Sequence, residues 1–334
     1  MKKIIFIVIL VFLLSTLYLL KNRQQSSKLT KFVIALDWTP NTNHTGIYVA
    51  LSKGWYKALG LDVKILPYSS NVSSDVLISN GKADVGIGAT EGILADAATG
   101  APIVSIAGII SHNTSGFVAL ANNGINRPKD FIGKLYGGGG SPTETAIIRS
   151  IIKKDGGTGN FKNVSLDVEA MQALETKKID FVWVFEGWEV IQARRQGYKI
   201  NYFSLLSYGI PDYYTPNIIT SPSEIKQKSE LLKKFMGATK KGYEYAIVHP
   251  EEAAKILIAS VPKGTFPDTD FIIASQEFLS KHYTDKGKPW GFQTKEGWHK
   301  YPQFLINNQA ILDSDGKPVK SLDLDSLYTN KFLQ

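Results

Sequence analysis

Cysteine does not occur in this chain of 334 residues. Its absence excludes a disulfide framework, a thiol nucleophile, a thiolate metal site and a lipid-modified cysteine. Histidine is also scarce, and its five occurrences lack the spacing of metal ligands: His44, His112, His249, His282 and His299. The sequence therefore predicts no metal site, no catalytic residue and no cofactor, and no Ser-His-Asp arrangement can be argued from it.

A concentrated basic region in the folded part is missing as well. The formal net charge is +8, but Lys2, Lys3, Lys21, Arg23 and Lys28 supply five of these charges, with no acid before residue 31. The remainder of the chain thus carries a net charge of +3. Because a domain of this charge has no basic footprint for nucleic acid, we expect no nucleic-acid partner.

Only one long hydrophobic run occurs, from Ile4 to Leu20, and Ser15 and Thr16 interrupt it. Two lysines precede the run and a polar segment follows it, so residues 1–28 are predicted to be a signal or anchor helix outside the fold. The run is short for a spanning helix but lacks a small-x-small cleavage site, and we favour an uncleaved anchor. We therefore expect an extracytoplasmic protein that is anchored to the cell membrane through this helix, or else secreted or periplasmic.

Beyond this segment, strand-like and helix-like stretches alternate, which is typical of α/β proteins with parallel sheets. The first series has expected strands at 32–38, 61–68, 83–89 and 102–110 and helices near 44–59, 70–81 and 91–99. The second series has strands at 116–121, 134–136, 164–168 and 180–185 and helices at 142–154, 170–178 and 188–196. A strand at 216–220 and amphipathic helices follow. The sequences G-K-A-D at 81–84 and K-K-I-D at 177–180, each before an apolar strand, indicate two similar lobes.

Residues 36–48 are the most informative stretch, with the sequence L-D-W-T-P-N-T-N-H-T-G-I-Y. They follow an apolar strand and lead into a helical pattern, which places polar and aromatic side chains at the carboxyl edge of a sheet. This edge is where α/β proteins hold small ligands.

This motif and the K-G-W-Y-x-x-x-G-L-D-V that follows it resemble the binding proteins of thiamine-precursor ABC transporters, a family shared with fungal thiamine-pyrimidine synthases. The similarity continues through segments 137–144, 180–188, 212–216 and 234–245, so it covers about residues 31–334. It implies a periplasmic-binding-protein-like fold of type II, in which two α/β lobes are joined by a two-strand hinge. Lobe 1 would comprise residues 30–118 plus 215–334, and lobe 2 residues 119–210.

The resemblance also implies a function. Such a protein would be the extracytoplasmic solute-binding protein of an ABC importer, with a thiamine pyrimidine precursor bound in the cleft between its lobes. The ligand would be an aminopyrimidine such as formylaminopyrimidine or hydroxymethylpyrimidine, delivered to permease and ATPase subunits. We accordingly expect a monomer that is not an enzyme, tethered by its first helix because it lacks the lipoprotein cysteine common in the family.

A planar ring with exocyclic amines needs aromatic faces to stack on and acceptors for its N–H groups. The stacking candidates are Trp38, Phe185, Trp188, Tyr213 and Tyr214. Trp38 could instead fill the core at the end of its lobe. Because adjacent strand residues face opposite ways, we expect at least one of Tyr213 and Tyr214 to line the cleft.

The polar candidates are Asp37, Asn41, Asn43 and Glu186, and the first motif adds His44 and Tyr48. Glu186 is the strongest of them because it follows an apolar strand at a carboxyl edge, although an acid there could also cap the next helix. Asp37 could bind backbone N–H groups of its own turn. His44 could form hydrogen bonds at a helix start instead of contacting a ligand.

Residues 137–144, G-G-G-G-S-P-T-E, form the last candidate segment. Successive glycines allow close backbone approach, so Gly138, Gly139, Ser141 and Glu144 are ligand-binding candidates. Ser141 and Glu144 also fit a capping box, which is the favoured interpretation for Glu144. The resembling proteins often have tryptophan where Gly139 stands, which implies a roomier pocket in this chain.

Lysine and arginine are absent from segments 36–48, 136–144, 183–188 and 211–217. A sulfonate, nitrate or phosphate ligand would need fixed positive donors, so a neutral or weakly cationic ligand is expected. Another flat heteroaromatic such as riboflavin is an alternative cargo. A pyrimidine-biosynthetic enzyme is a further alternative, but the synthases that the chain resembles carry a cysteine-rich motif that this sequence cannot form.

Overall fold

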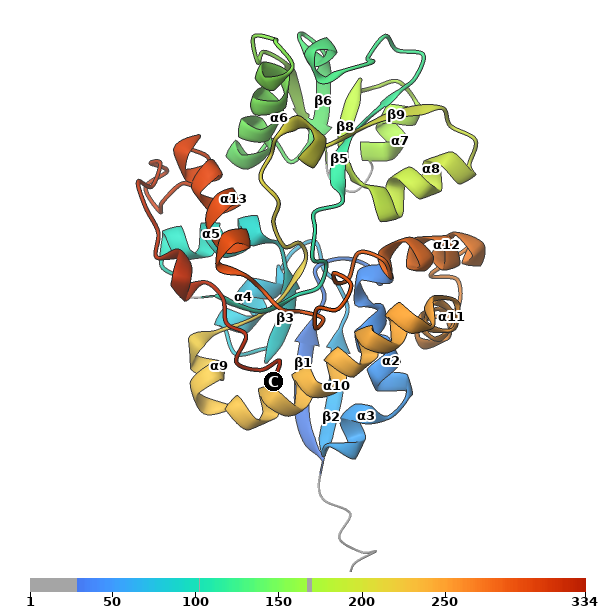
Figure 1. Ribbon diagram of the computed structural model, residues 1–334, viewed down its shortest axis with the longest axis vertical. Helices are drawn as coiled ribbons and strands as arrows, with labels where there is room; N and C mark the ends of the chain where they lie inside the picture. The colour runs from blue at the N-terminus through green and yellow to red at the C-terminus, as the bar shows by residue number, and fades with distance from the viewer. Residues whose placement is uncertain (1–28, 102, 167–169) are drawn as a thin grey trace, which may run out of the picture.

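The computed structural model describes residues 29–101, 103–166 and 170–334 of the protein. The chain forms two α/β lobes, one above the other in Figure 1, and its C-terminus lies on the lower lobe. The expected signal or anchor helix, residues 1–28, lies outside the described residues. In the described part, no helix is both long enough and apolar enough to cross a membrane.

The lower lobe contains a five-stranded sheet with the strand order β2-β1-β3-β10-β4. Its strands are β1 (Thr30–Ala35), β2 (Leu61–Leu66), β3 (Val85–Gly88), β4 (Val104–Gly108) and β10 (Asn217–Thr220). The first three are parallel, whereas β10 runs antiparallel to both β3 and β4. A late segment of the chain is therefore inserted into the middle of the first sheet.

Helices cover both faces of this sheet, because strand β1 in its interior is apolar on both sides. Phe32 and Ile34 of β1 belong to one apolar cluster with α2 (Thr45–Ser52) and α10 (Ser229–Val248). Val33 and Ala35 belong to another with α4 (Ser74–Ser79) and α5 (Thr90–Thr99). The helices of this part are η1 (Thr42–His44), α2 (Thr45–Ser52), α3 (Trp55–Ala58), α4 (Ser74–Ser79), α5 (Thr90–Thr99), α9 (Pro222–Gln227), α10 (Ser229–Val248), α11 (Pro250–Ser260), α12 (Thr269–Leu279), α13 (Lys295–Asn307) and η5 (Leu324–Ser326).

The upper lobe contains the second five-stranded sheet, in the order β7-β6-β8-β5-β9. Its strands are β5 (Ser115–Leu120), β6 (Leu135–Gly138), β7 (Lys162–Ser165), β8 (Phe181–Phe185) and β9 (Ile200–Ser204). Strand β6 is parallel to β7 and β8, and β5 is antiparallel to β8 and β9. The helical elements are η2 (Pro128–Phe131), α6 (Pro142–Lys154), α7 (Ala170–Glu175), η3 (Glu186–Val190), α8 (Ile191–Arg195) and η4 (Leu206–Tyr208).

Two segments connect the lobes, one at residues 109–114 between β4 and β5 and one at residues 205–216 between β9 and β10. Both pass through the middle of the molecule in Figure 1. The lobe boundary expected after residue 118 needs correction, because it falls inside β5, which pairs with β8 and β9 of the upper sheet. The remaining boundaries of the proposed lobes stay a prediction.

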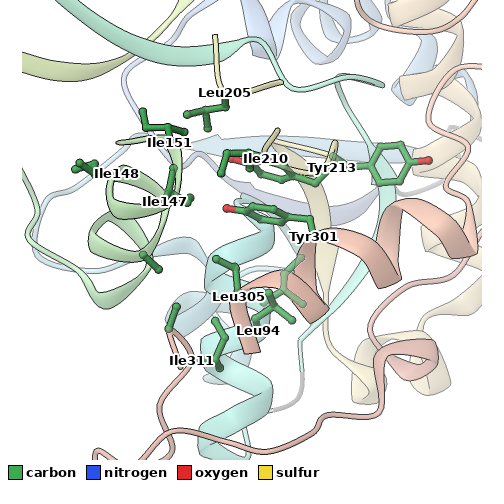
Figure 2. Packing of buried hydrophobic residues seen from close by; sticks show 14 of the residues in the cluster. Leu94, Ile147, Ile148, Ile151, Leu205, Ile210, Tyr213, Tyr301, Leu305 and Ile311 are labelled. Carbon is green, nitrogen blue, oxygen red and sulfur yellow. The ribbon is translucent and has the colours of Figure 1, made fainter. Parts of the chain in front are cut away.

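An apolar cluster joins the lobes on one side of the molecule. Figure 2 shows Ile147 and Ile151 of α6, Leu94 of α5 and Leu305 of α13 in this cluster, together with Tyr213. Helix α13 therefore contributes to the packing between the lobes as well as to the lower lobe, whereas the sequence resemblance placed the whole tail on lobe 1.

The predicted α/β class is confirmed, and α6 has the predicted bounds. Two local expectations were wrong, and one strand was missed. The helix expected near 44–59 is interrupted at Lys53 and Gly54, where glycine adopts a positive φ of 71°. The helix expected at 188–196 starts earlier, with the π-helical turn η3. Strand β9 was not predicted, because most of its residues are only half-buried and its side chains form no continuous apolar run.

Candidate functional site

Two adjoining cavities lie between elements of the two lobes. Cavity A, of about 250 Å³, is lined by residues of the β1–η1 turn, by η3 and by the second connecting segment. Cavity B, of about 610 Å³, is lined by the first turns of α5 and α6, by β8 and by residues 310–312. They share Ala89, Phe185 and Thr215, so the two cavities adjoin each other, and together they are called the cleft.

Cavity A contains the aromatic and acidic side chains of the first motif. Trp38 lines it with 37% of its surface exposed, and its ring lies 5.1 Å from that of Tyr68. Asp37 and Asn41 line it as well. The Asn41 side chain accepts a hydrogen bond from the Asn43 N–H (2.8 Å) and donates one to the Thr39 carbonyl (3.0 Å), so its polar atoms serve the local turn.

His44 is fully buried and does not line either cavity. Its Nδ1 accepts a hydrogen bond from the backbone N–H of Asn41 (3.3 Å), which leaves the proton on Nε2. Nε2 then donates to Oδ1 of Asp37 at 2.9 Å. The expectation of His44 at the cleft is thus corrected in favour of the alternative: it forms hydrogen bonds at a helix start and holds Asp37 in place.

Tyr48 also lies away from both cavities, which corrects its expected position. It is 5% exposed and belongs to an apolar cluster with Leu257 of α11 and Phe271 of α12. Burial raises the pKa of its hydroxyl to about 12. Tyr48 lies one turn into α2 and faces the neighbouring helices. The part of the motif that lines the cleft ends before it, at η1.

The end of β8 and the turn after it contribute Phe185, Trp188 and an acid that differs from the expected one. Phe185 is 41% exposed and lines both cavities, and Trp188 lines cavity A with its ring edge-on to Phe271 at 4.6 Å. The acid in cavity A is Glu189, whose Oε2 accepts a hydrogen bond from the Phe185 N–H at 2.9 Å. Burial raises the pKa of the Glu189 carboxyl above its usual range.

Glu186, the strongest polar candidate from the sequence, lines neither cavity. Its backbone N–H donates to the Thr114 carbonyl at 2.9 Å, and the same oxygen accepts a hydrogen bond from the Tyr202 hydroxyl at 2.8 Å. The reason is local: the chain turns into η3 at Glu186 itself, so residues of the following turn face the cavity. The F-E-G-W-E sequence contained both acids, and only the π-helical turn distinguishes them.

Of the two adjacent tyrosines, Tyr213 lines cavity B and Tyr214 lines neither cavity. The Tyr213 ring stacks on that of Tyr301 of α13, with ring centroids 3.6 Å apart. Figure 2 shows these two side chains together. The Tyr214 hydroxyl instead lies 3.1 Å from that of Thr294, on the far side of the connecting segment. Their opposite directions follow from the extended backbone between them.

The glycine-rich segment places Ser141 and Glu144 in the lining of cavity B but not Gly138 or Gly139. Glu144 is mainly a cap: its carboxylate accepts hydrogen bonds from the backbone N–H groups of Ser141 (2.8 Å) and Gly139 (3.1 Å). The Ser141 hydroxyl in turn accepts from the Glu144 N–H at 3.1 Å, which completes the predicted capping box. Gly138 has no room for a side chain, because a Cβ there would overlap the Tyr136 hydroxyl.

The charged side chains that line the cleft are all acidic within the described part of the chain. Among the described residues, no lysine, arginine or histidine lines cavity A or B. Glu91 of α5, which the sequence reasoning missed, lines cavity B and accepts a hydrogen bond from Tyr301 at 2.5 Å. Its position just after β3 is the same carboxyl-edge signal that identified Asp37. Nowhere in the described chain do three or more possible ligand side chains gather into a metal site.

Two α/β lobes, two connecting segments and a cleft between them define the periplasmic-binding-protein class of fold. A periplasmic aliphatic sulphonate-binding protein from Escherichia coli shares this fold, with a TM-score of 0.66 at 11% identity over 91% of this chain and 99% of that one. The sequence profile of the NMT1/THI5-like family matches residues 41–253, and the chain belongs to this family.

The names of two relatives refer to a pyrimidine. A formylaminopyrimidine-binding protein from Halalkalibacterium halodurans is 26% identical over 277 residues, which cover 81% of this chain and 83% of that protein. A 4-amino-5-hydroxymethyl-2-methylpyrimidine phosphate synthase from Legionella pneumophila is 26% identical over 314 residues, 92% of this chain and 94% of that protein. The relatives of this chain thus include a protein whose name describes binding of a pyrimidine and one whose name describes synthesis of a pyrimidine phosphate.

Proposed function

We propose that this protein is the extracytoplasmic solute-binding protein of an ABC importer and binds an aminopyrimidine precursor of thiamine in cavity A. Formylaminopyrimidine and hydroxymethylpyrimidine are the ligands to test. The observation that carries the proposal is the lining of cavity A, where Trp38, Phe185 and Trp188 accompany the carboxylates of Asp37 and Glu189. These are the ring faces and acceptors that a flat, amine-bearing ring requires.

The size and charge of cavity A support the same ligand class. Its volume of about 250 Å³ lies just below the range of about 300–1,000 Å³ typical of pockets for drug-sized molecules, so it suits a single ring. An anion would meet two carboxylates and no cation among the described lining residues. A neutral or weakly cationic heterocycle is therefore favoured over a sulfonate or a phosphate.

Both lobes contribute to cavity A, which suggests how binding would be coupled to closure. Trp38 follows β1 of the lower sheet, whereas Phe185 and Glu189 belong to the end of β8 and the turn after it. A ligand that contacts both groups stabilises the arrangement in which the lobes are together. The closed protein, acting as a monomer, would then present its cargo to permease and ATPase subunits.

The decisive experiment compares two glutamates that are three positions apart. Glu189→Gln keeps an oxygen for the Phe185 N–H but removes the negative charge in cavity A, whereas Glu186→Gln makes the same change outside it. A hydrogen bond to a charged group contributes about 1.5–3 kcal/mol, so calorimetry should show roughly ten- to a hundredfold weaker binding of hydroxymethylpyrimidine or formylaminopyrimidine to Glu189→Gln.

Glu186→Gln is the matched control, and it should bind these pyrimidines within about twofold of the wild-type protein. Equal losses in the two variants would refute the assigned role of Glu189. If the wild-type protein bound neither pyrimidine, the proposed function itself would be wrong.

A further inference from the structure

Cavity B is larger than cavity A and adjoins it. Its volume is about 610 Å³ against about 250 Å³, and the two cavities share Ala89, Phe185 and Thr215. Because the same three residues line both cavities, the cavities lie next to each other.

Three aromatic side chains line cavity B, and its other walls are mainly small or aliphatic. The aromatic residues are Trp183, Phe185 and Tyr213, and Pro142 and Ile311 lie among the apolar remainder. Tyr213 is fixed by its stacking on Tyr301 at 3.6 Å, so its ring cannot readily rotate away. Such walls favour a flat, largely apolar group over a sugar or a chain rich in hydroxyls.

The acids of cavity B determine the charge that this group can carry. The first turns of α5 and α6 line the cavity, and helix N-termini would by themselves attract an anion. However, Glu91 and Glu144 already occupy those first turns, and no lysine, arginine or histidine faces them in the described lining. A bound anion would be repelled, whereas a cation near the aromatic faces and the two carboxylates would be stabilised.

From this combination we propose that cavity B binds a second, cationic aromatic ring that is covalently linked to the pyrimidine in cavity A. The cargo would then be a two-ring molecule. This inference rests on the proposed function, since it assumes that the first ring occupies cavity A.

The test uses thiamine, in which a pyrimidine is linked to a cationic thiazolium ring, and hydroxymethylpyrimidine, which lacks the second ring. Calorimetric titration of the full-length wild-type protein should give an affinity for thiamine at least about tenfold higher than for hydroxymethylpyrimidine, because only thiamine fills both cavities.

A glycine substitution blocks cavity B selectively. Gly92 of α5 lines cavity B, and a Cβ at this position would meet no heavy atom within 4 Å. Gly92→Phe should therefore fold and fill part of the cavity, with thiamine affinity reduced at least about tenfold and hydroxymethylpyrimidine affinity changed by less than about twofold. Gly237→Phe is the matched control, because Gly237 is also an exposed helical glycine with open space around its Cβ, but in α10.

A second variant tests the charge. Glu91→Gln keeps an oxygen that can accept the Tyr301 hydroxyl, so the local structure should persist. Thiamine affinity should fall at least about fivefold in this variant, and hydroxymethylpyrimidine affinity should stay within about twofold.

The outcomes separate the two proposals. If the wild-type protein binds hydroxymethylpyrimidine but binds thiamine no better, the inference about cavity B is overturned and the proposed function stands. The inference is also overturned if Gly92→Phe weakens the binding of both ligands equally or of neither. If neither ligand nor formylaminopyrimidine binds, the proposed function fails, and the inference fails with it.

Discussion

At the scale of single residues, several side chains of the motifs hold other residues in position. His44 connects two parts of one turn, accepting the Asn41 N–H and donating to Asp37. Because Asp37 lines cavity A and His44 does not, the histidine acts on the cleft through the orientation of the aspartate.

Replacing His44 should therefore affect stability as well as binding. In His44→Ala the buried Asn41 N–H loses its acceptor, which costs about 1–3 kcal/mol of unfolding free energy. Urea denaturation followed by circular dichroism measures this change. Asp37→Asn is the control, because its amide oxygen still accepts the proton from His44, and it should lose less than about 1 kcal/mol. A stable His44→Ala variant would contradict the structural role assigned to the histidine.

At the scale of elements, the two lobes align parallel strands with the same kind of hydrogen bond, from a backbone N–H of one strand to an aspartate that precedes another. The carboxylate of Asp84, just before β3, accepts a hydrogen bond from the Val33 N–H of β1 at 2.5 Å. In the other lobe, the carboxylate of Asp180, just before β8, accepts one from the Leu135 N–H of β6 at 2.8 Å. The similar sequences at 81–84 and 177–180 thus correspond to one repeated structural role.

The hydrogen bond to Asp180 can be tested separately from other interactions. Asp84 also pairs with Lys228, whereas Asp180 has no such ion pair within the described part of the chain. Asp180→Ala leaves the Leu135 N–H at the start of β6 without its acceptor, and about 1–3 kcal/mol of unfolding free energy should be lost. Asp180→Asn retains an acceptor oxygen and should recover most of that loss in chemical denaturation. If the two variants were equally destabilised, the strand-aligning hydrogen bond would not be the cause.

At the scale of the whole molecule, a histidine joins the two connecting segments. His112 of the first segment hydrogen-bonds through Nδ1 to Asp212 of the second, and its Nε2 lies 2.8 Å from Asp285 of the C-terminal part. Burial alone would lower the pKa of His112, but the hydrogen bonds to the two aspartates outweigh it and raise the pKa above 6.5.

This raised pKa predicts how stability depends on pH. A group with a higher pKa in the folded state contributes its full stabilisation below its unfolded pKa of about 6.5 and loses it as the pH rises through the folded value. The difference in unfolding free energy between the wild-type protein and His112→Asn should therefore shrink between about pH 6 and pH 8. Denaturation midpoints at several pH values measure it. A difference that grew with pH would show that His112 is not held as a cation by Asp212 and Asp285.

The sequence by itself determined the family and the α/β class. Alternating apolar segments indicated the order of most strands and helices, although not β9, and the capping box of α6 marked where that helix starts. Trp38 and Phe185 were selected as candidates because each stands at or just beyond the carboxyl end of an apolar strand, where α/β proteins hold ligands.

The tertiary structure decided which of two neighbouring side chains faces the cleft and how large the cleft is. Glu189 takes the place expected for Glu186 because the chain turns into η3 at residue 186. Tyr213 and not Tyr214 lines cavity B because α13 supplies Tyr301 as its stacking partner. Side-chain direction depends on the backbone path beyond each strand and on packing between segments far apart in sequence, and local patterns of residues do not contain that information.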